Sequence, residues 1–127
     1  MFNFNNDVFE NTQKLTPAVL QACDMLGMYQ AELASVLGLQ CADIGRMTSI
    51  QQFLIPGSSA WEKAVLFIRF YQHLYDQYGG NEVKMVHWLR ADLAEFSNSP
   101  LLLMVDEGRL AFLLDYLSNQ SCSAGKR

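Results

Sequence analysis

The sequence predicts an all-α protein of about six or seven helices. Apolar residues recur at helical spacing along most of the chain, and no segment alternates apolar and polar residues for long, as a half-buried strand would. Glycines, prolines and capping residues separate these apolar stretches at short intervals. Half of the 127 residues are apolar, which is enough for the core of one domain or of two small helical units.

The first predicted helix follows a polar extension, residues 1–15, that is either partly disordered or lays its apolar residues on a neighbour. Thr16 and Pro17 predict the start of this helix, because a hydroxyl side chain is a good N-cap and proline suits the first helical position. Gly27 predicts its end. The apolar residues of the extension are Phe2, Phe4, Val8 and Phe9.

Residues 30–37 and 41–48 are predicted to form two short helices joined by a tight turn. Gly38 stands where the first of them must end, a position that favours a positive φ, and Ala34 is small, as required where two helices nearly touch. The spacing directs five residues into one core: Leu33, Leu37, Leu39, Ile44 and Met47. This pattern is typical of a helix-turn-helix, whose second helix can enter the DNA major groove, although it also fits two core helices that never meet DNA.

The exposed face of the helix over residues 41–48 is the candidate DNA-binding surface. Gln40 could read adenine, and Arg46 could read guanine or hold a phosphate. The same residue types also fit an ordinary solvated helix face, so both interpretations stay open. The candidate residues are Gln40, Asp43, Arg46, Thr48 and Ser49.

The charge of this part of the chain opposes DNA binding. Residues 1–57 have a net charge of −3, and the whole chain has −4. A DNA-binding face normally concentrates Lys and Arg, so we expect a single copy to bind DNA poorly at physiological salt. Gly45 also costs about 1 kcal/mol of helix propensity relative to alanine. The charged residues of the segment are Lys14, Arg46, Asp7, Glu10, Asp24, Glu32 and Asp43.

The pair Pro56-Gly57 predicts a break in the chain and the boundary between two units. A short helical piece over residues 51–54 is expected just before this break. After it, Ser59 and Glu62 match a capping box, Ser first and Glu three residues later, and open a long helix that extends to about residue 78.

The long helix over residues 59–78 is apolar on more than one side. Leu66 and Phe70 lie beyond its main apolar arc, among charged and polar neighbours. Such a helix is either central to a core or bridges to another chain, and here the second alternative is a homodimer contact through Leu66 and Phe70. A charged share of 17%, below the ~25% of average domains, also indicates a surface covered by a partner or a second copy.

Three further segments complete the second half. Asn81 is predicted to cap a helix over residues 82–90, a polar connection follows, and residues 100–105 form either a helical turn or a buried extended piece. Asp106 is predicted to cap a last helix from residue 107 to about residue 118. The predicted organisation is an extension at 1–15, a helix-turn-helix domain at 16–57, a second helical domain at 58–118 and a flexible tail at 119–127.

Motifs for catalysis, metal binding and targeting are not found in the sequence. No glycine-rich phosphate loop occurs, and the two histidines and three cysteines have no metal-ligand spacing. Cys23 and Cys41 are expected to be core thiols. We therefore expect a cytoplasmic protein that is not an enzyme, has no cofactor and no metal, and, lacking an apolar run of about 20 residues, does not enter the membrane.

The order of motifs in the second half resembles the C-terminal toxin-binding domain of the Xre/MbcA/ParS family of bacterial antitoxins. A glycine-acidic turn leads into a helix that ends in Trp-Leu, a loop runs to Pro-Leu, and Glu-Gly opens a final leucine-rich helix. The family commonly places an Xre-like helix-turn-helix upstream, as at residues 30–49. The motifs are Gly79-Gly80-Asn81-Glu82, Met85-Val86-His87-Trp88-Leu89, Ser99-Pro100-Leu101, Asp106-Glu107-Gly108-Arg109-Leu110 and Leu113-Leu114-Asp115-Tyr116-Leu117.

This resemblance implies an antitoxin of a type II toxin–antitoxin system. Such antitoxins bind RES-domain toxins that consume NAD, and their C-terminal region covers the mouth of the toxin's NAD pocket. The complex often binds its own promoter for transcription regulation, with several copies supplying avidity. The family usually has a glycine pair in the loop after Trp-Leu, whereas this chain has residues 93–98 without glycine, which would change the loop's shape.

Seven residues are candidates for the partner-binding surface. Trp88 is expected mainly as a core anchor, Pro100 as a stiffener of the loop, and Gly108 as a site of close packing. Arg109 and the pair Lys126-Arg127 could reach an anionic nucleotide pocket, or they are simply solvated. The seven are Trp88, Pro100, Leu101, Gly108, Arg109, Lys126 and Arg127.

Two other functions remain as alternatives. One is a stand-alone helix-turn-helix transcriptional regulator, which predicts DNA binding by the isolated protein with a steep dependence on salt. The other is a non-catalytic adaptor that only oligomerises, which predicts large assemblies without DNA or toxin.

Overall fold

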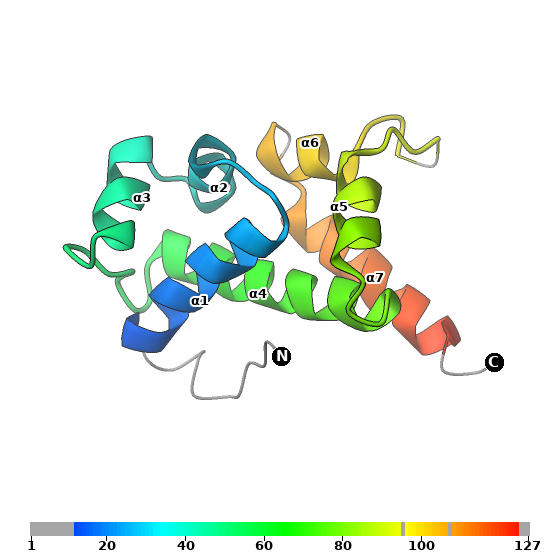
Figure 1. The fold of residues 1–127 in the computed structure, drawn as a ribbon, viewed down its shortest axis with the longest axis horizontal. Coiled ribbons are helices and arrows are strands. Elements are labelled where there is room, and N and C mark those ends of the chain that lie inside the picture. Colours follow the sequence, from blue (N-terminus) through cyan, green and yellow to red (C-terminus); the bar gives the residue numbers. More distant parts are fainter. Residues whose placement is uncertain (1–11, 95, 107, 125–127) are drawn as a thin grey trace. The chain divides into compact units, whose positions relative to one another are not determined.

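The all-α prediction is confirmed by a computed structural model that describes residues 12–94, 96–106 and 108–124 (Figure 1). In these residues, Leu93 and Asn98 form an isolated antiparallel β-bridge. The helices are α1 (Thr12–Met25), α2 (Gln30–Leu37), α3 (Cys41–Thr48), α4 (Ser59–Gln77), α5 (Glu82–Arg90), α6 (Pro100–Val105) and α7 (Leu110–Ala124).

The chain divides into two compact units, and the division falls between Ile68 and Arg69, inside α4. Unit 1 contains α1, α2, α3 and the first part of α4, whereas unit 2 contains the rest of α4 with α5, α6 and α7. The break at Pro56-Gly57 lies before α4, whereas the division into units lies within α4. The first turns of α4 therefore belong to the same compact unit as α1, α2 and α3. Ala64, Phe67 and Ile68 of this part of α4 are fully buried.

The predicted helix-turn-helix core is confirmed in unit 1 apart from one residue. Leu33, Leu37, Ile44 and Met47 are buried, and α3 packs against both α2 and α1. Leu39 is half-buried instead, because it follows the turn and lies beside a surface hollow. The bounds of α2, α3 and α5 agree with the predicted ranges 30–37, 41–48 and 82–90.

The predicted start of the first helix is wrong. Helix α1 begins at Thr12, so Pro17 lies inside the helix and Thr16 is not its N-cap. The Thr16 hydroxyl instead accepts a hydrogen bond from the backbone N–H of Leu54 at 3.0 Å, and both residues are buried. The predicted helical piece at 51–54 is also wrong, since residues 51–55 are not helical and Leu54 N–H is used in this tertiary contact.

Two predicted caps are displaced. The N-cap of α4 is Ser58 rather than Ser59, because Ser58 Oγ accepts a hydrogen bond from Trp61 N–H at 3.1 Å. Asp106 does not cap α7 but is the C-cap of α6, and its N–H donates to Leu102 carbonyl oxygen at 2.8 Å.

The last helix also differs from its prediction. It starts later, at Leu110, and continues to Ala124, so residues 119–124 are helical rather than a flexible tail. The two cations Lys126 and Arg127 lie outside the described residues, as do the apolar residues of the N-terminal extension.

Helices α1 to α4 end in the same hydrogen-bonded motif. In each, two successive N–H groups after the helix bond back to carbonyls of its last turn, and the first of the two residues has a positive φ. Glycine occupies this position in α1, α2 and α4, but in α3 it is Ile50, with φ +61°. An L-residue in this conformation costs roughly 1–2 kcal/mol, and a β-branched one is least suited to it. The positions are Gly27, Gly38, Ile50 and Gly79.

Replacing Gly45 by alanine is expected to stabilise the protein by up to about 1 kcal/mol. Gly45 lies inside α3, and apart from its chain neighbours and the backbone of its own helix no atom comes within 4 Å of the place its Cβ would take. Gly38→Ala should instead destabilise by about 1 kcal/mol, because Gly38 has φ +73° and Lys63 Nζ would lie 3.3 Å from the new methyl group. Urea denaturation of the two variants checks the opposite signs, and a loss of stability in Gly45→Ala would contradict the expectation.

Candidate DNA-facing and partner-binding surfaces

The α3 surface is organised around the carboxylate of Asp43. One oxygen accepts the backbone N–H of Gln40 at 3.0 Å, and the other accepts Arg46 Nη2 at 2.7 Å and Gln52 Nε2 at 3.3 Å. Arg46 Nε in turn donates to Gln52 Oε1 at 2.7 Å. The network closes on itself, and it uses the Nε–H and one Nη2–H of the five N–H donors of Arg46.

This arrangement holds the pKa of Asp43 below its usual range. The main cause is the hydrogen bond from the backbone of Gln40, followed by the side chains of Gln52 and Arg46. A carboxyl group whose pKa is lower in the folded state stabilises the fold above its unfolded pKa, and this contribution is lost as the pH falls through the folded value. Asp43 is therefore ionised at neutral pH, and its carboxylate accepts the backbone N–H of Gln40 at the start of α3.

The structure brings Gln40, Asp43 and Arg46 together but places Thr48 elsewhere. Thr48 is two residues from Arg46, so it lies on another side of the helix. Its hydroxyl donates a hydrogen bond to the Ile44 carbonyl oxygen at 2.9 Å. Thr48 also borders a hollow next to α1. Ser49 is the exposed C-cap of α3. Gln52 joins the face from the following loop, and no helical spacing pointed to it.

The hollow next to α1 has a volume of about 250 Å³ and contains Cys23. The Cys23 thiol lies 3.5 Å from the carbonyl oxygen of Met28, and its residue is 5% exposed. Burial, with the charges of Glu32 and Asp24, raises the pKa of Cys23 to about 11. The prediction of a core thiol is confirmed for Cys23 but is wrong for Cys41, which is exposed at the start of α3.

The two thiols are expected to differ strongly in reactivity. In a Cys122→Ser variant at about pH 8, an alkylating reagent should modify Cys41 rapidly and spare Cys23, because the thiolate is the nucleophile and Cys23 is both buried and protonated. Mass spectrometry of the peptides before and after unfolding measures this. Rapid native-state modification of Cys23 would contradict the described packing.

Unit 2 contains an aromatic cluster centred on Phe96. The Phe96 ring meets Trp88 at 6.5 Å, Phe112 at 5.7 Å and Tyr116 at 5.0 Å between ring centroids, each in an edge-on arrangement. The loop that carries Phe96 is closed by the hydrogen bond from Leu93 N–H to Asn98 carbonyl oxygen at 3.1 Å. The cluster joins α5, the loop over residues 91–99 and α7.

The sequence did not predict the contacts of Phe96 with Phe112 and Tyr116. Residues 91–99 had been interpreted only as a polar connection, so Phe96 was not expected to pack against α7. The available signal was Phe96 itself, the one aromatic residue among residues 91–99. The loop over residues 91–99 is thus held against α5 and α7 by one aromatic side chain.

The predicted partner-binding residues differ in accessibility. Trp88 is half-buried and its ring lies 6.4 Å from that of Phe70, which agrees with a core anchor. Pro100 and Leu101 are buried in the first turn of α6. Arg109 is exposed and lies over the Phe112 ring, with Cζ 4.3 Å from the centroid. Gly108 has φ +64° and open space at its Cβ position, so it allows a turn and not the close packing we expected.

Phe70 does not lie on an open surface. Its side chain is fully buried in unit 2, while Leu66 is half-buried in unit 1. A homodimer contact through Phe70 would require the ring to leave its own core. The burial of Phe70 therefore favours the other interpretation, a central core helix.

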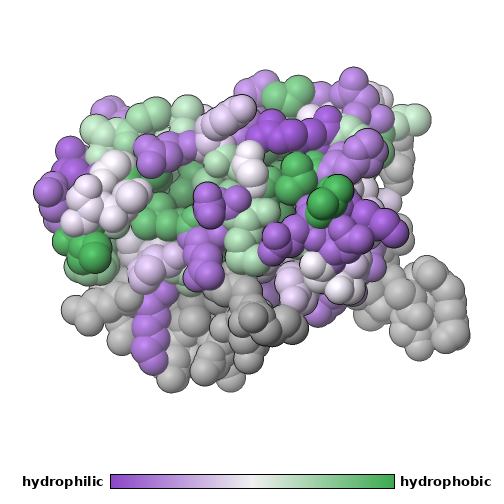
Figure 2. All heavy atoms as spheres, in the orientation of Figure 1, coloured by the Kyte–Doolittle hydropathy of each residue, from purple (hydrophilic) through white to green (hydrophobic). Residues whose placement is uncertain are grey.

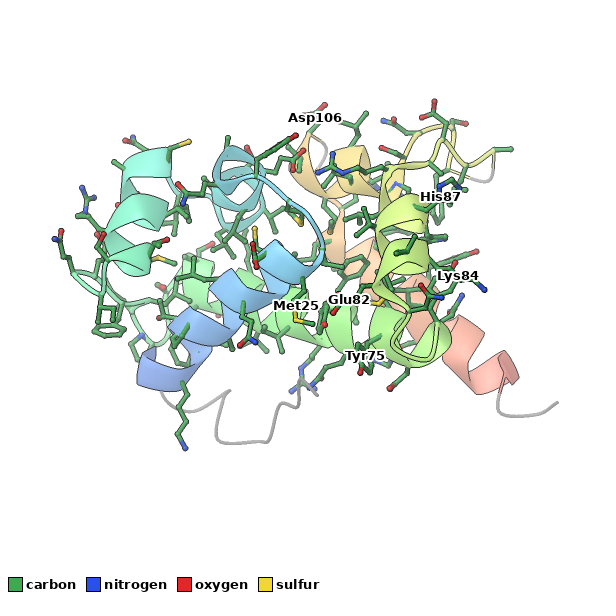
Figure 3. The ribbon with its side chains drawn as sticks, in the orientation of Figure 1. Met25, Tyr75, Glu82, Lys84, His87 and Asp106 are labelled. Atoms are coloured by element: carbon green, nitrogen blue, oxygen red, sulfur yellow. The ribbon has the colours of Figure 1, made fainter. Side chains whose placement is uncertain are left out.

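An open apolar groove lies along α5 in unit 2. It has a volume of about 430 Å³, and Val83 on its wall is 80% exposed. Lys84 and His87 stand at its border and project from the outer side of α5 (Figure 3). Burial raises the pKa of Tyr78, whose hydroxyl therefore stays neutral. The groove is lined by Tyr78, Val83, Lys84, His87, Trp88, Ala91 and Leu93.

Unit 2 also contains a contact between a histidine and a serine side chain. His73 Nε2 lies 3.3 Å from Ser118 Oγ, a contact that joins α4 and α7 within unit 2. In residues 12–94, 96–106 and 108–124 no three His, Cys, Asp or Glu side chains gather as they would to hold a metal ion. No helix in the same ranges combines the length and hydropathy needed to cross a membrane.

Comparison with known proteins finds no protein-family model that matches this chain and no curated protein that matches its sequence.

Proposed function

We propose that this protein is a cytoplasmic, non-catalytic antitoxin of a type II toxin–antitoxin system. Unit 2 binds a RES-type, NAD-consuming toxin and covers its active site, and the helix-turn-helix of unit 1 contacts operator DNA when several copies assemble. The observation that carries the proposal is the open apolar groove of α5, beside Trp88 of the Trp-Leu motif. The resemblance of the motif order to the Xre/MbcA/ParS antitoxins supplies the identity of the partner.

The groove has the properties of a protein-binding surface. Its floor is apolar and its border carries the side chains of Lys84 and His87, so an apolar segment with an acidic flank fits it. Val83 adds a large apolar contact that is 80% exposed to water in the free chain. Covering this surface with a partner would remove apolar area from water, which is a favourable change.

The toxin interaction is tested by co-expression with the product of the adjacent gene. The expected result is a stable complex and relief of toxicity for the natural sequence, and loss of both for Val83→Asp, because a carboxylate in an apolar interface is costly. Ala42→Asp, at an exposed position of α3, is the control and should keep the complex. If neither the natural sequence nor the control binds a toxin, the proposal is wrong.

The proposed DNA contact predicts a specific effect of replacing Asp43. Asp43→Asn should increase the affinity for operator DNA several-fold, because it releases Arg46 and removes one negative charge from an acidic unit. Arg46→Ala should decrease the affinity by about tenfold, the loss typical of one good base or phosphate contact. Fluorescence anisotropy with operator DNA at several salt concentrations measures both, with each variant present as its toxin complex.

The same titrations separate the alternatives. An isolated protein that binds operator DNA and forms no toxin complex would favour a stand-alone transcriptional regulator. Unchanged affinity in both Asp43→Asn and Arg46→Ala would show that this face of α3 does not contact DNA.

A further inference from the structure

Unit 1 has a hollow between the turn after α2 and the segment that leads into α4, which we call the α4 hollow. Its volume is about 370 Å³, which is at the lower end of the range for small-molecule pockets. The residues that line it are all uncharged, and hydrophobic residues reach the surface where the loop after α3 lies (Figure 2). The apolar part of its lining includes Leu39, Phe53, Leu54 and Ile55.

The rim of the α4 hollow carries a cation. The Nζ atom of Lys63 lies 3.3 Å from the position that a Cβ on Gly38 would take, and Gly38 belongs to the lining. Gly38 is the C-cap of α2, so the negative end of that helix favours an ammonium group here. Lys63 is exposed and forms no ion pair with another residue in the part of the chain that the structure describes. Its charge is therefore available to an anion in the hollow.

The lining and the cation together select a class of ligand. An uncharged apolar wall favours an alkyl chain, because covering the wall removes apolar area from water. An ammonium group at the rim favours a carboxylate, which accepts charge-assisted hydrogen bonds from it. Nucleic acid fits poorly, because its row of phosphates requires several cations on the contact face. A short aliphatic carboxylic acid satisfies both features with one molecule.

Gln52 connects the α4 hollow with the surface of α3. This residue lines the hollow, and its side chain also belongs to the network of Asp43 and Arg46. Gln52 Oε1 accepts Arg46 Nε–H at 2.7 Å, and Gln52 Nε2 donates to Asp43 at 3.3 Å. A ligand that moves the Gln52 side chain would therefore change the hydrogen bonds of Arg46.

We propose that the α4 hollow binds the anion of a short aliphatic carboxylic acid, with the chain on the apolar wall and the carboxylate at Lys63. The bound acid changes the Arg46 network through Gln52. This inference concerns a small ligand of unit 1, and both of its parts are tested without toxin or DNA. Its failure is therefore distinguishable from failure of the proposed antitoxin function.

Octanoate is the probe, titrated into the isotope-labelled full chain below the concentration at which it forms micelles. The amide NMR signals of residues 38–39 and 52–60 should shift, and the Arg46 Nε–H signal should shift with the same dissociation constant. Lys63→Gln should weaken octanoate binding by roughly threefold, the loss typical of one exposed ion pair. Octan-1-ol has the same chain without the charge and should bind equally to this variant and to the natural sequence.

Two further variants test the position of the ligand. Ile55→Asp should weaken octanoate binding by about tenfold, because it places a second carboxylate on the wall, and Ile55 is 71% exposed, so the fold should tolerate the change. Lys14→Gln removes the same charge as Lys63→Gln from an exposed position of α1 and is the matched control, so it should bind octanoate like the natural sequence.

The outcomes divide as follows. Shifts at the α4 hollow and at Arg46 Nε–H, together with weaker binding by Lys63→Gln but not by Lys14→Gln, support the proposal. Signals at residues 38–39 and 52–60 that do not move, or shifts along α5 in their place, overturn it. Octanoate binding by Lys63→Gln that equals that of the natural sequence, or an Arg46 Nε–H signal that stays unchanged at saturation, also overturns it.

Discussion

Replacing Phe96 by alanine is expected to lower the free energy of unfolding by about 3 kcal/mol. Phe96 is half-buried, yet its ring meets three other aromatic rings at 5.0 to 6.5 Å and joins α5, the loop over 91–99 and α7. Alanine removes all three edge-on contacts and the apolar area that the ring buries between α5, the loop and α7. Urea denaturation followed by tryptophan fluorescence measures the loss, since Trp88 is one of the partners.

Two variants serve as controls for the Phe96 substitution. Phe112→Ala removes a ring that is 39% exposed and meets Phe96 alone among the described aromatic pairs, so it should cost less. Ser97→Gly should stabilise slightly, because Ser97 has φ +57°. A Phe96→Ala variant as stable as the natural sequence would mean that the loop is not held by this ring.

The second large effect is expected at Thr16. Thr16→Val keeps the shape of the side chain but removes the acceptor of the Leu54 N–H hydrogen bond, and both residues are buried. A buried N–H without a partner costs about 1–3 kcal/mol, so the free energy of unfolding should fall by about 2 kcal/mol. Thr16→Ser keeps the hydroxyl and should lose much less. Equal losses in the two variants would assign the effect to packing of the methyl group instead.

Local patterns were sufficient to predict much of the fold. The helices at 30–37, 41–48 and 82–90 have caps and apolar spacing within themselves, and the structure reproduces their bounds. Gly38 was identified because a reversal of the chain after a short helix needs a positive φ, which it has. These features depend on residues a few positions apart, so the local sequence is sufficient to predict them.

The features that sequence reasoning missed depend on distant contacts. Thr16 has the same side chain whether it caps a helix or binds Leu54, and only the position of Leu54, 38 residues away, decides between them. Gln52 reaches the Asp43 carboxylate from a loop, and Phe96 finds its partners in two different helices. No spacing rule predicts such contacts, because they are set by how the helices pack.

The position of the division inside α4 has a practical consequence. Most domains can be separated at an exposed linker, but here a cut between Ile68 and Arg69 would sever a helix and expose Phe67, Ile68 and Phe70, which are fully buried. A fragment designed to carry either binding surface alone should therefore include the complete α4.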